Sequence, residues 1–96
     1  MTRDEVLDIL ADHRQELHER FGVESLAVFG SLVRGESTAQ SDIDILVSFD
    51  GPATSKRYFG VQFYLEDLLG RPVDLVTDKA LRPELRPYIE REAIRA

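Results

Sequence analysis

The sequence predicts a two-layer α/β domain built on a small three-stranded mixed sheet flanked by about four helices. Stretches with helical spacing of apolar residues alternate with short runs rich in Val, Ile, Leu and Phe, which are typical of strands. Hydrophobic residues make up 43% of the 96 residues, which is ordinary for a globular protein and sufficient for one modest core. No repeat, low-complexity tract or linker interrupts this order, so we expect one domain spanning residues 1–96.

The first helix is predicted over about 3–20. Thr2 begins a capping box at its start, and Gly22 is the expected stop. Apolar residues at helical spacing give this helix one face that can cover a sheet. No residues near His13 or His18 in the sequence have the spacing of metal ligands, so we interpret both histidines as packing or surface residues.

Strand character recurs in three runs that are bounded by turn-forming residues. The runs cover about 24–29, 43–49 and 72–77. The first run ends at Gly30 and Ser31, which we expect to form a turn. A single helical turn at about 32–35 and a small polar loop at 36–41 then lead to the second run.

A third helical segment is predicted over about 56–69. Its expected buried stripe consists of Tyr58, Val61, Leu65, Leu68 and Leu69. Phe59 and Phe63 form a second row, four residues apart. We interpret this row as part of the core rather than as aromatics that stack on a ligand.

The last section, after the third strand, is broken by two prolines, Pro83 and Pro87, into a short turn and a final helix at about 86–95. Four arginines lie near one another on a helical net: Arg82, Arg86, Arg91 and Arg95. Glutamates are interleaved with them, so a solvated face and a partner-binding face both remain open.

Composition excludes several classes of protein. No run of about 18 apolar residues is present, so we expect no membrane span, and the first residues lack the apolar segment of a signal peptide. The absence of cysteine excludes disulfides and thiolate metal sites, and a cytoplasmic protein is the expectation. Twelve Lys and Arg against eighteen Asp and Glu give a net charge of −6, so long nucleic acid is not an expected partner.

Three aspartates are the candidate metal ligands. Asp42 and Asp44 stand two apart at the start of a strand, which places both side chains on one face. Asp74 interrupts an otherwise apolar strand, where an unpartnered carboxylate is costly. If the two strands are neighbours, the three carboxylates can converge on divalent cations such as Mg²⁺ or Mn²⁺. The alternatives are an Asx turn at Asp42 and a surface or Arg71-paired role for Asp74.

The candidate anion site is the turn that follows the first strand. Gly30 allows close approach of its backbone to a ligand, and Ser31 adds a hydroxyl and, if a short helix begins there, free amides. Arg34, one turn further on, can contact a phosphate through its guanidinium. Arg34 can equally pair with Glu36 or with an aspartate of the site.

These residues together resemble the minimal nucleotidyltransferases of the DNA polymerase β superfamily, which act as antitoxins paired with HEPN-type toxins. The resemblance covers nearly the whole chain. It rests on Gly30-Ser31, Arg34-Gly35, Ser41-Asp42-Ile43-Asp44, Val73-Asp74-Leu75-Val76, and a tail from Ala80-Leu81-Arg82-Pro83 to Ile89-Glu90-Arg91-Glu92-Ala93. Pro87 is a mild departure that concerns only where the last helix starts.

The resemblance implies a polymerase β-like fold and transfer of AMP from ATP to a hydroxyl, typically a tyrosine of the cognate toxin. It implies two Mg²⁺ ions, with Mn²⁺ as the substitute, held by the catalytic carboxylates of Asp42, Asp44 and Asp74. Gly30 and Ser31, with Arg34 as a further candidate, would bind the nucleotide. A hetero-oligomer with the toxin would follow.

Two other functions remain open from the residues alone. The domain can be an antitoxin that blocks its toxin by direct binding without catalysis, or a metal-stabilised structural subunit. The presence of all three carboxylates and of the Gly-Ser turn argues against an inactive site.

Overall fold

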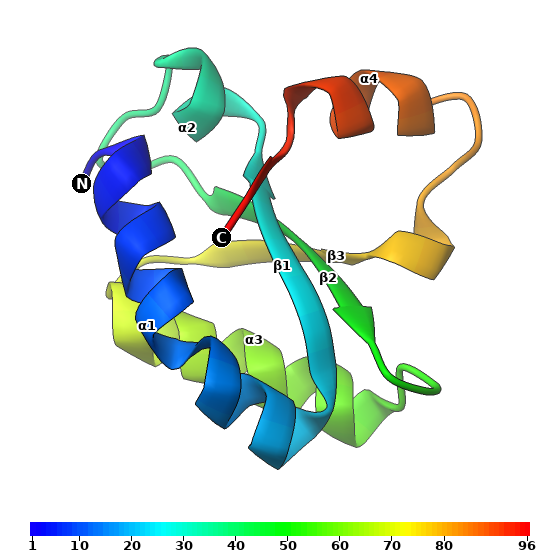
Figure 1. Cartoon of the computed structure of the whole chain (residues 1–96). Coiled ribbons are helices and arrows are strands. Elements are labelled where there is room, and N and C mark those ends of the chain that lie inside the picture. The colour runs from blue at the N-terminus through cyan, green and yellow to red at the C-terminus, as the bar shows by residue number, and fades with distance from the viewer.

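The computed structural model describes all 96 residues, and its elements follow the predicted order (Figure 1). The elements are α1 (Arg3–Phe21), β1 (Val23–Phe29), α2 (Ser31–Arg34), β2 (Ile43–Phe49), α3 (Ser55–Leu69), β3 (Val73–Thr77), the 3₁₀ turn η1 (Asp78–Ala80), α4 (Arg86–Glu92) and β4 (Ile94–Arg95). The sheet is mixed, with strand order β3-β2-β1-β4. β1 runs antiparallel to β2 and β4, and β2 runs parallel to β3.

The fourth strand corrects the prediction of a three-stranded sheet. The final helix was expected to reach 95, but α4 ends at Glu92, and Ala93 has an extended backbone that turns the chain away. Ile94 and Arg95 then pair antiparallel with β1. A strand of two residues is too short to produce a periodic pattern in the sequence. Pro87 lies within the first turn of α4, where its missing N–H does not disrupt the helix.

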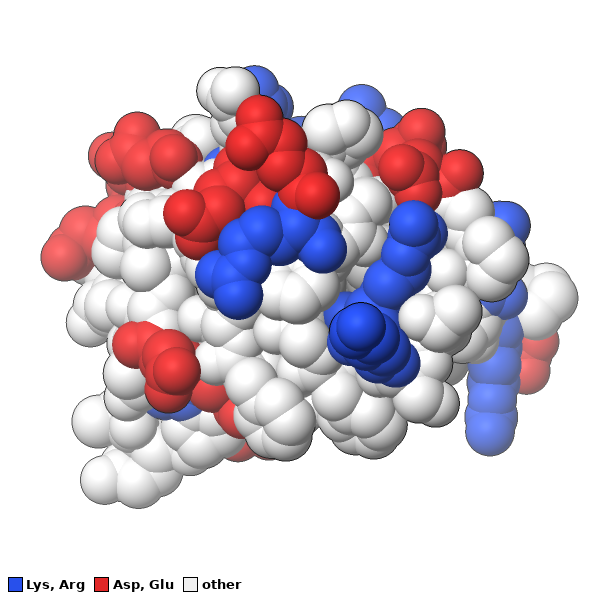
Figure 2. Space-filling model, turned by 90° about the horizontal axis from the view of Figure 1, so that it is seen from below, with Lys and Arg blue, Asp and Glu red and all other residues white.

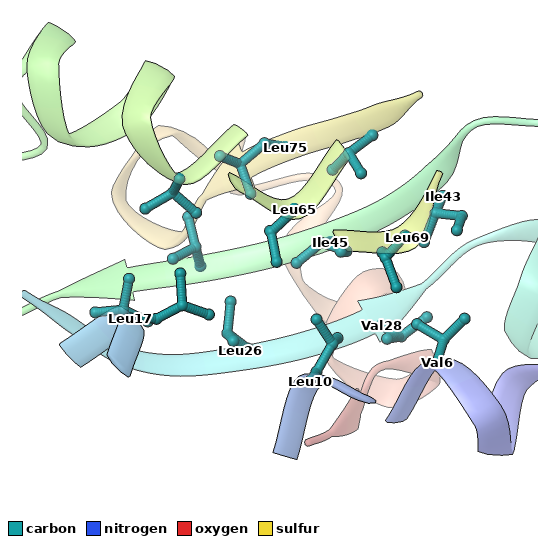
Figure 3. Close-up of a cluster of buried hydrophobic side chains, with 14 of the residues drawn as sticks. Val6, Leu10, Leu17, Leu26, Val28, Ile43, Ile45, Leu65, Leu69 and Leu75 are labelled. Carbon is teal, nitrogen blue, oxygen red and sulfur yellow. The ribbon is translucent and has the colours of Figure 1, made fainter. Parts of the chain in front are cut away.

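Helices α1 and α3 cover the same face of the sheet, and the core lies between them and the strands (Figures 1 and 3). Each strand contributes alternate residues to this layer, because successive side chains of a strand point to opposite faces. The largest fully buried side chains are Leu10, Leu17, Leu26, Ile43, Ile45 and Leu65. The opposite face of the sheet carries no such layer, and it is flanked by α4 and η1.

The interpretation of the second aromatic row on α3 as core was wrong. Phe59 and Phe63 are 50% and 62% exposed, and their rings stack on each other with centroids 6.3 Å apart. The reason is that α3 packs on a single sheet and buries a single stripe, formed by Val61, Leu65 and Leu69. A row displaced from that stripe faces solvent.

Helix α3 also covers the free backbone edge of β3, which is an edge strand. Tyr58 donates its hydroxyl proton to Leu75 O at 2.6 Å, and Gln62 Nε2 donates to Val73 O at 3.3 Å. Glu66 Oε2 accepts from Val73 N at 3.0 Å. The three side chains are spaced four residues apart, so they project from one row of the helix. They hold the backbone on both sides of Asp74.

Charged groups of both signs are interspersed over the molecular face seen from below, and Figure 2 shows no continuous basic surface there. None of the helices combines the length and the apolar character that crossing a membrane requires.

We predict opposite outcomes for two truncations on α3. Leu65→Ala removes a fully buried side chain and should lower the free energy of unfolding by about 2–5 kcal/mol. Phe63→Ala, two residues away, removes a mostly exposed ring and should change the free energy by no more than about 0.5 kcal/mol. Urea denaturation of both variants measures the difference. An equal loss in the two would contradict the assignment of the buried stripe.

Candidate functional site

Two carboxylates lie side by side on the open face of the sheet, away from α1 and α3. Asp44 of β2 is the direct partner of Asp74 in β3 and of Phe29 in β1. Residues that are direct partners in neighbouring strands point to the same face, with their strands about 4.8 Å apart. Asp44 is half-buried and Asp74 is exposed at the edge strand. The predicted approach of these two aspartates is therefore present.

Gly30 closes the other side of Asp44. A Cβ built on Gly30 would overlap Asp44 Oδ2 and lie 2.9 Å from the carboxyl carbon. The backbone of Gly30 has φ 75° and ψ −150°, a region that is essentially restricted to glycine. Glycine is therefore required at position 30 for two reasons: its backbone conformation, and the space that the Asp44 carboxylate occupies.

Ser31 follows as the first residue of α2, which begins immediately beyond the end of β1. The Gly30-Ser31 turn thus stands at the same end of the sheet as the aspartates, as the sequence predicted.

The site concentrates negative charge. Burial raises the pKa of Asp44 to about 6, and the charge of Asp74, a hydrogen bond to that residue and the charge of Asp42 act in the same direction. Arg34 opposes the shift. Two carboxylates so placed favour either a shared proton or a bound cation.

Asp42 precedes β2 and is exposed. It is near enough for its charge to act on Asp44. However, no group of three or more Asp, Glu, His or Cys side chains stands close enough together to hold a metal ion in this arrangement. The geometry thus provides a carboxylate pair with a third carboxylate beside it. The donors are all oxygen atoms, which suits Mg²⁺ or Mn²⁺.

Arg71 is a residue of the site that the sequence did not reveal. It does not pair with Asp74. Its Nη2 donates to Thr38 O at 2.7 Å, to Ser37 Oγ at 3.3 Å and to Ser41 O, while its Nε is buried without a partner. One guanidinium thereby anchors the loop that delivers Asp42. No local signal identifies such a residue, because its partners lie about thirty positions away in the sequence.

Arg34 is engaged in ion pairs rather than left free. Its Nε lies 2.7 Å from Glu36 Oε1 and its Nη1 lies 2.6 Å from Glu92 Oε1. Of the alternatives that the sequence left open, the structure therefore shows the pair with Glu36. The second bond ties α2 to α4, so contact with a phosphate requires Arg34 to leave one of these partners.

The other charged residues singled out in the sequence have structural partners or different positions. Arg86 pairs with Asp78 and Glu90, each at 3.0 Å, whereas Arg95 lies in β4 rather than on the helix. The four arginines therefore do not form one helical face.

The two histidines contact the backbone. His13 Nδ1 lies 2.8 Å from Ile9 O, and His18 Nδ1 lies 3.0 Å from Val23 O. With the ring N–H as donor, each makes a hydrogen bond to a carbonyl, which agrees with packing and surface roles.

Comparisons with known proteins identify the family of this chain. The family model described as a nucleotidyltransferase domain matches residues 10–96. The protein adenylyltransferase MntA of Thermococcus cleftensis is 43% identical over 94 residues, which span 98% of this chain and 95% of the relative.

Solved structures show the same fold. A structure assigned to the minimal nucleotidyltransferases superposes with a TM-score of 0.74 at 38% identity, covering 92% of this chain and 93% of the other. A chain from the complex of a tri-AMPylated Shewanella oneidensis HEPN toxin with an MNT antitoxin superposes with a TM-score of 0.60 at 18% identity, covering 96% and 66%.

The family match spans most of the chain and the relative matches over nearly the full length of both proteins. This chain therefore belongs to the nucleotidyltransferase domain family, in its branch of minimal nucleotidyltransferases of the DNA polymerase β superfamily.

Proposed function

We propose that this protein transfers AMP from ATP to a tyrosine hydroxyl of a HEPN-type RNase toxin and thereby neutralises the toxin. The observation that carries the proposal is the placement of Asp44 directly beside Asp74, against a glycine that no other residue can replace. Paired carboxylates with oxygen-only donors next to a helix start suit a metal-bound triphosphate.

The relatives support the choice of reaction and partner. One relative is named as a protein adenylyltransferase, and one structural neighbour was solved with an AMPylated HEPN toxin. The names belong to those proteins, and the proposal extends them to this chain on the strength of the shared family.

In this proposal Asp42, Asp44 and Asp74 would hold two divalent cations, which would neutralise charge and lower the pKa of the acceptor hydroxyl. The negative charge gathered at Asp44 is the feature that a cation would relieve. Asp42 completes the set from the loop that Arg71 anchors. The backbone amides at Gly30 and Ser31, with the Ser31 hydroxyl, bind the β- and γ-phosphates. The contribution of the protein is positioning and electrostatic stabilisation.

The decisive experiment incubates the protein with α-labelled ATP, Mg²⁺ and the toxin. We expect label on the toxin and loss of its RNase activity. The double variant Asp42→Ala/Asp44→Ala should abolish both effects, because it removes two of the three metal ligands.

A steric antitoxin gives a different result in the same assay. It would inhibit the toxin without label, and the double variant would inhibit equally well. A wild-type protein that binds neither metal nor nucleotide would exclude the transferase altogether.

Gly30→Ala should lower the rate of transfer about 100-fold, whereas Gly35→Ala should not. The new methyl group at position 30 displaces the Asp44 carboxylate, and a displacement of about 1 Å in a catalytic group can cost about 100-fold in rate. Gly35 has the same φ of 75°, but no atom lies within 4 Å of a Cβ placed there. Initial rates of labelling, with folding checked by circular dichroism, compare the two variants. Both place a side chain at a positive φ, and only position 30 adds the ψ of −150° and the clash with Asp44. Equal loss in both would contradict the assigned role of Gly30.

The contribution of Asp44 to the stability of the metal-free protein should fall as pH rises from about 4 to about 6. The pKa of Asp44 is raised to about 6 in the folded state from an ordinary value near 3.8, so the folded state binds the proton more tightly than the unfolded state. The penalty for ionisation is absent below this window and complete above it. Asp44→Asn should therefore stabilise the metal-free protein at pH 7.5 and have little effect below about pH 4.

Urea denaturation at the two pH values measures this difference. Asp67→Asn, on the exposed side of α3, is the matched control and should have no such pH dependence. Mg²⁺ should stabilise the wild-type protein above pH 6 more than it stabilises Asp44→Asn. The same stability difference between wild type and Asp44→Asn at every pH would refute this account of Asp44.

A further inference from the structure

The open face of the sheet holds a hollow of about 280 Å³ next to the carboxylates. Its floor is made by Ala27 and Leu46, with Ser25 and Ser48 behind them. Ala27 and Leu46 are direct partners in β1 and β2. Leu46 lies two residues after Asp44, and Ala27 lies two residues before Phe29, the partner of Asp44, so these side chains share one face of the sheet. The hollow therefore begins about 7 Å from Asp44, since alternate residues of a strand are that far apart.

The hollow lies on the opposite side of the carboxylates from the Gly30-Ser31 turn. That turn follows the end of β1, whereas Ala27 and Ser25 precede it in the same strand. Along the sheet, the Gly30-Ser31 turn is therefore followed by the pair of carboxylates, then by the apolar floor of the hollow, and last by Ser25 and Ser48. This order corresponds to the line of an in-line displacement, in which the attacking and leaving groups stand on opposite sides of the phosphorus.

Ion pairs join two of the walls of the hollow. Arg86 bridges Asp78 of η1 and Glu90 of α4, at 3.0 Å to each, and its Nη2 donates to Asp78 O at 2.8 Å. Arg95 of β4 forms part of the lining. At the far end, the hydroxyls of Ser25 and Ser48 hydrogen-bond to each other at 2.5 Å. A hollow with an apolar floor and polar walls suits an aromatic side chain that carries a hydroxyl.

We infer that this hollow receives the acceptor side chain, an aromatic hydroxyl presented by a segment of the partner protein. The inference rests on the proposed function, because it takes the triphosphate to lie at the Gly30-Ser31 turn. The volume of the hollow, about 280 Å³, lies at the lower end of the roughly 300–1,000 Å³ of small-molecule sites and leaves room for one aromatic side chain.

The transfer step follows from this placement. The acceptor oxygen forms a bond to the α-phosphorus from the side of the hollow. The bond between the α-phosphorus and the oxygen bridging to the β-phosphate breaks, and pyrophosphate leaves with both electrons toward the Gly30-Ser31 turn. The proton of the hydroxyl passes to the Asp74 carboxylate. The Ala27 and Leu46 side chains contact the ring and take no part in bond making.

Filling the hollow tests the inference. Ala27→Phe and Ser48→Phe occupy it from two different strands, and Ala11→Phe, on the exposed side of α1, is the matched control. We expect AMP transfer to the toxin to fall at least tenfold in both hollow variants and to stay unchanged in the control. The affinity for α,β-methylene-ATP with Mg²⁺, measured by calorimetry, should be unchanged in all three.

A second measurement uses the wild-type protein and does not depend on the folding of variants. N-acetyl-tyrosinamide is titrated into the protein saturated with Mg²⁺ and α,β-methylene-ATP. We expect the NMR resonances of Ala27 and Leu46 to shift, and those of Ala11 to stay in place.

The outcomes separate the two proposals. Full transfer by both filled variants, or no shift at Ala27 and Leu46, would overturn the acceptor site and leave the transferase standing. Loss of nucleotide affinity in parallel with transfer would assign the hollow to the nucleoside and also overturn the inference. A wild-type protein that binds the nucleotide analogue but never labels the toxin would instead refute the proposed function.

Discussion

The parallel pairing of β2 with β3 is the constraint on which the rest of the site depends. It places Asp44 beside Asp74 on one face of the sheet, and the resulting repulsion and burial raise the pKa of Asp44 to about 6. Such an arrangement opposes folding at neutral pH unless a cation or a proton compensates the charge. The proposed metal-dependent nucleotidyl transfer would give the protein a reason outside its own stability to keep this arrangement.

Several contacts hold this unfavourable arrangement in place. Gly30 leaves the space into which the Asp44 carboxylate projects. Arg71 binds carbonyls of the loop before β2 and so limits where Asp42 can lie. Three side chains of α3, Tyr58, Gln62 and Glu66, bind backbone groups of the residues on either side of Asp74. Each carboxylate is thus fixed by a different part of the chain, and the core beneath supplies the stability that the charged row lacks.

The sequence identified the helices, the three longer strands and the residues that meet at the carboxylate row, because each of these leaves a local signal. Asp74 stood out as a carboxylate within an apolar strand, and Gly30 as a turn at the end of another. The sequence did not identify β4, which is too short for a pattern, or Arg71, whose partners are distant along the chain. It misplaced Phe59 and Phe63, since helical periodicity defines rows but does not tell how many of them a single sheet can cover.

The closure of the β3 edge has a consequence for how other proteins can approach. Tyr58, Gln62 and Glu66 occupy backbone groups that an incoming strand would otherwise use, so this side of the sheet is a poor template for cross-chain β-addition. Self-association and domain exchange through that border are disfavoured for the same reason. A macromolecule that reaches the aspartates is therefore expected to approach over the open face of the sheet rather than by adding a strand beside β3.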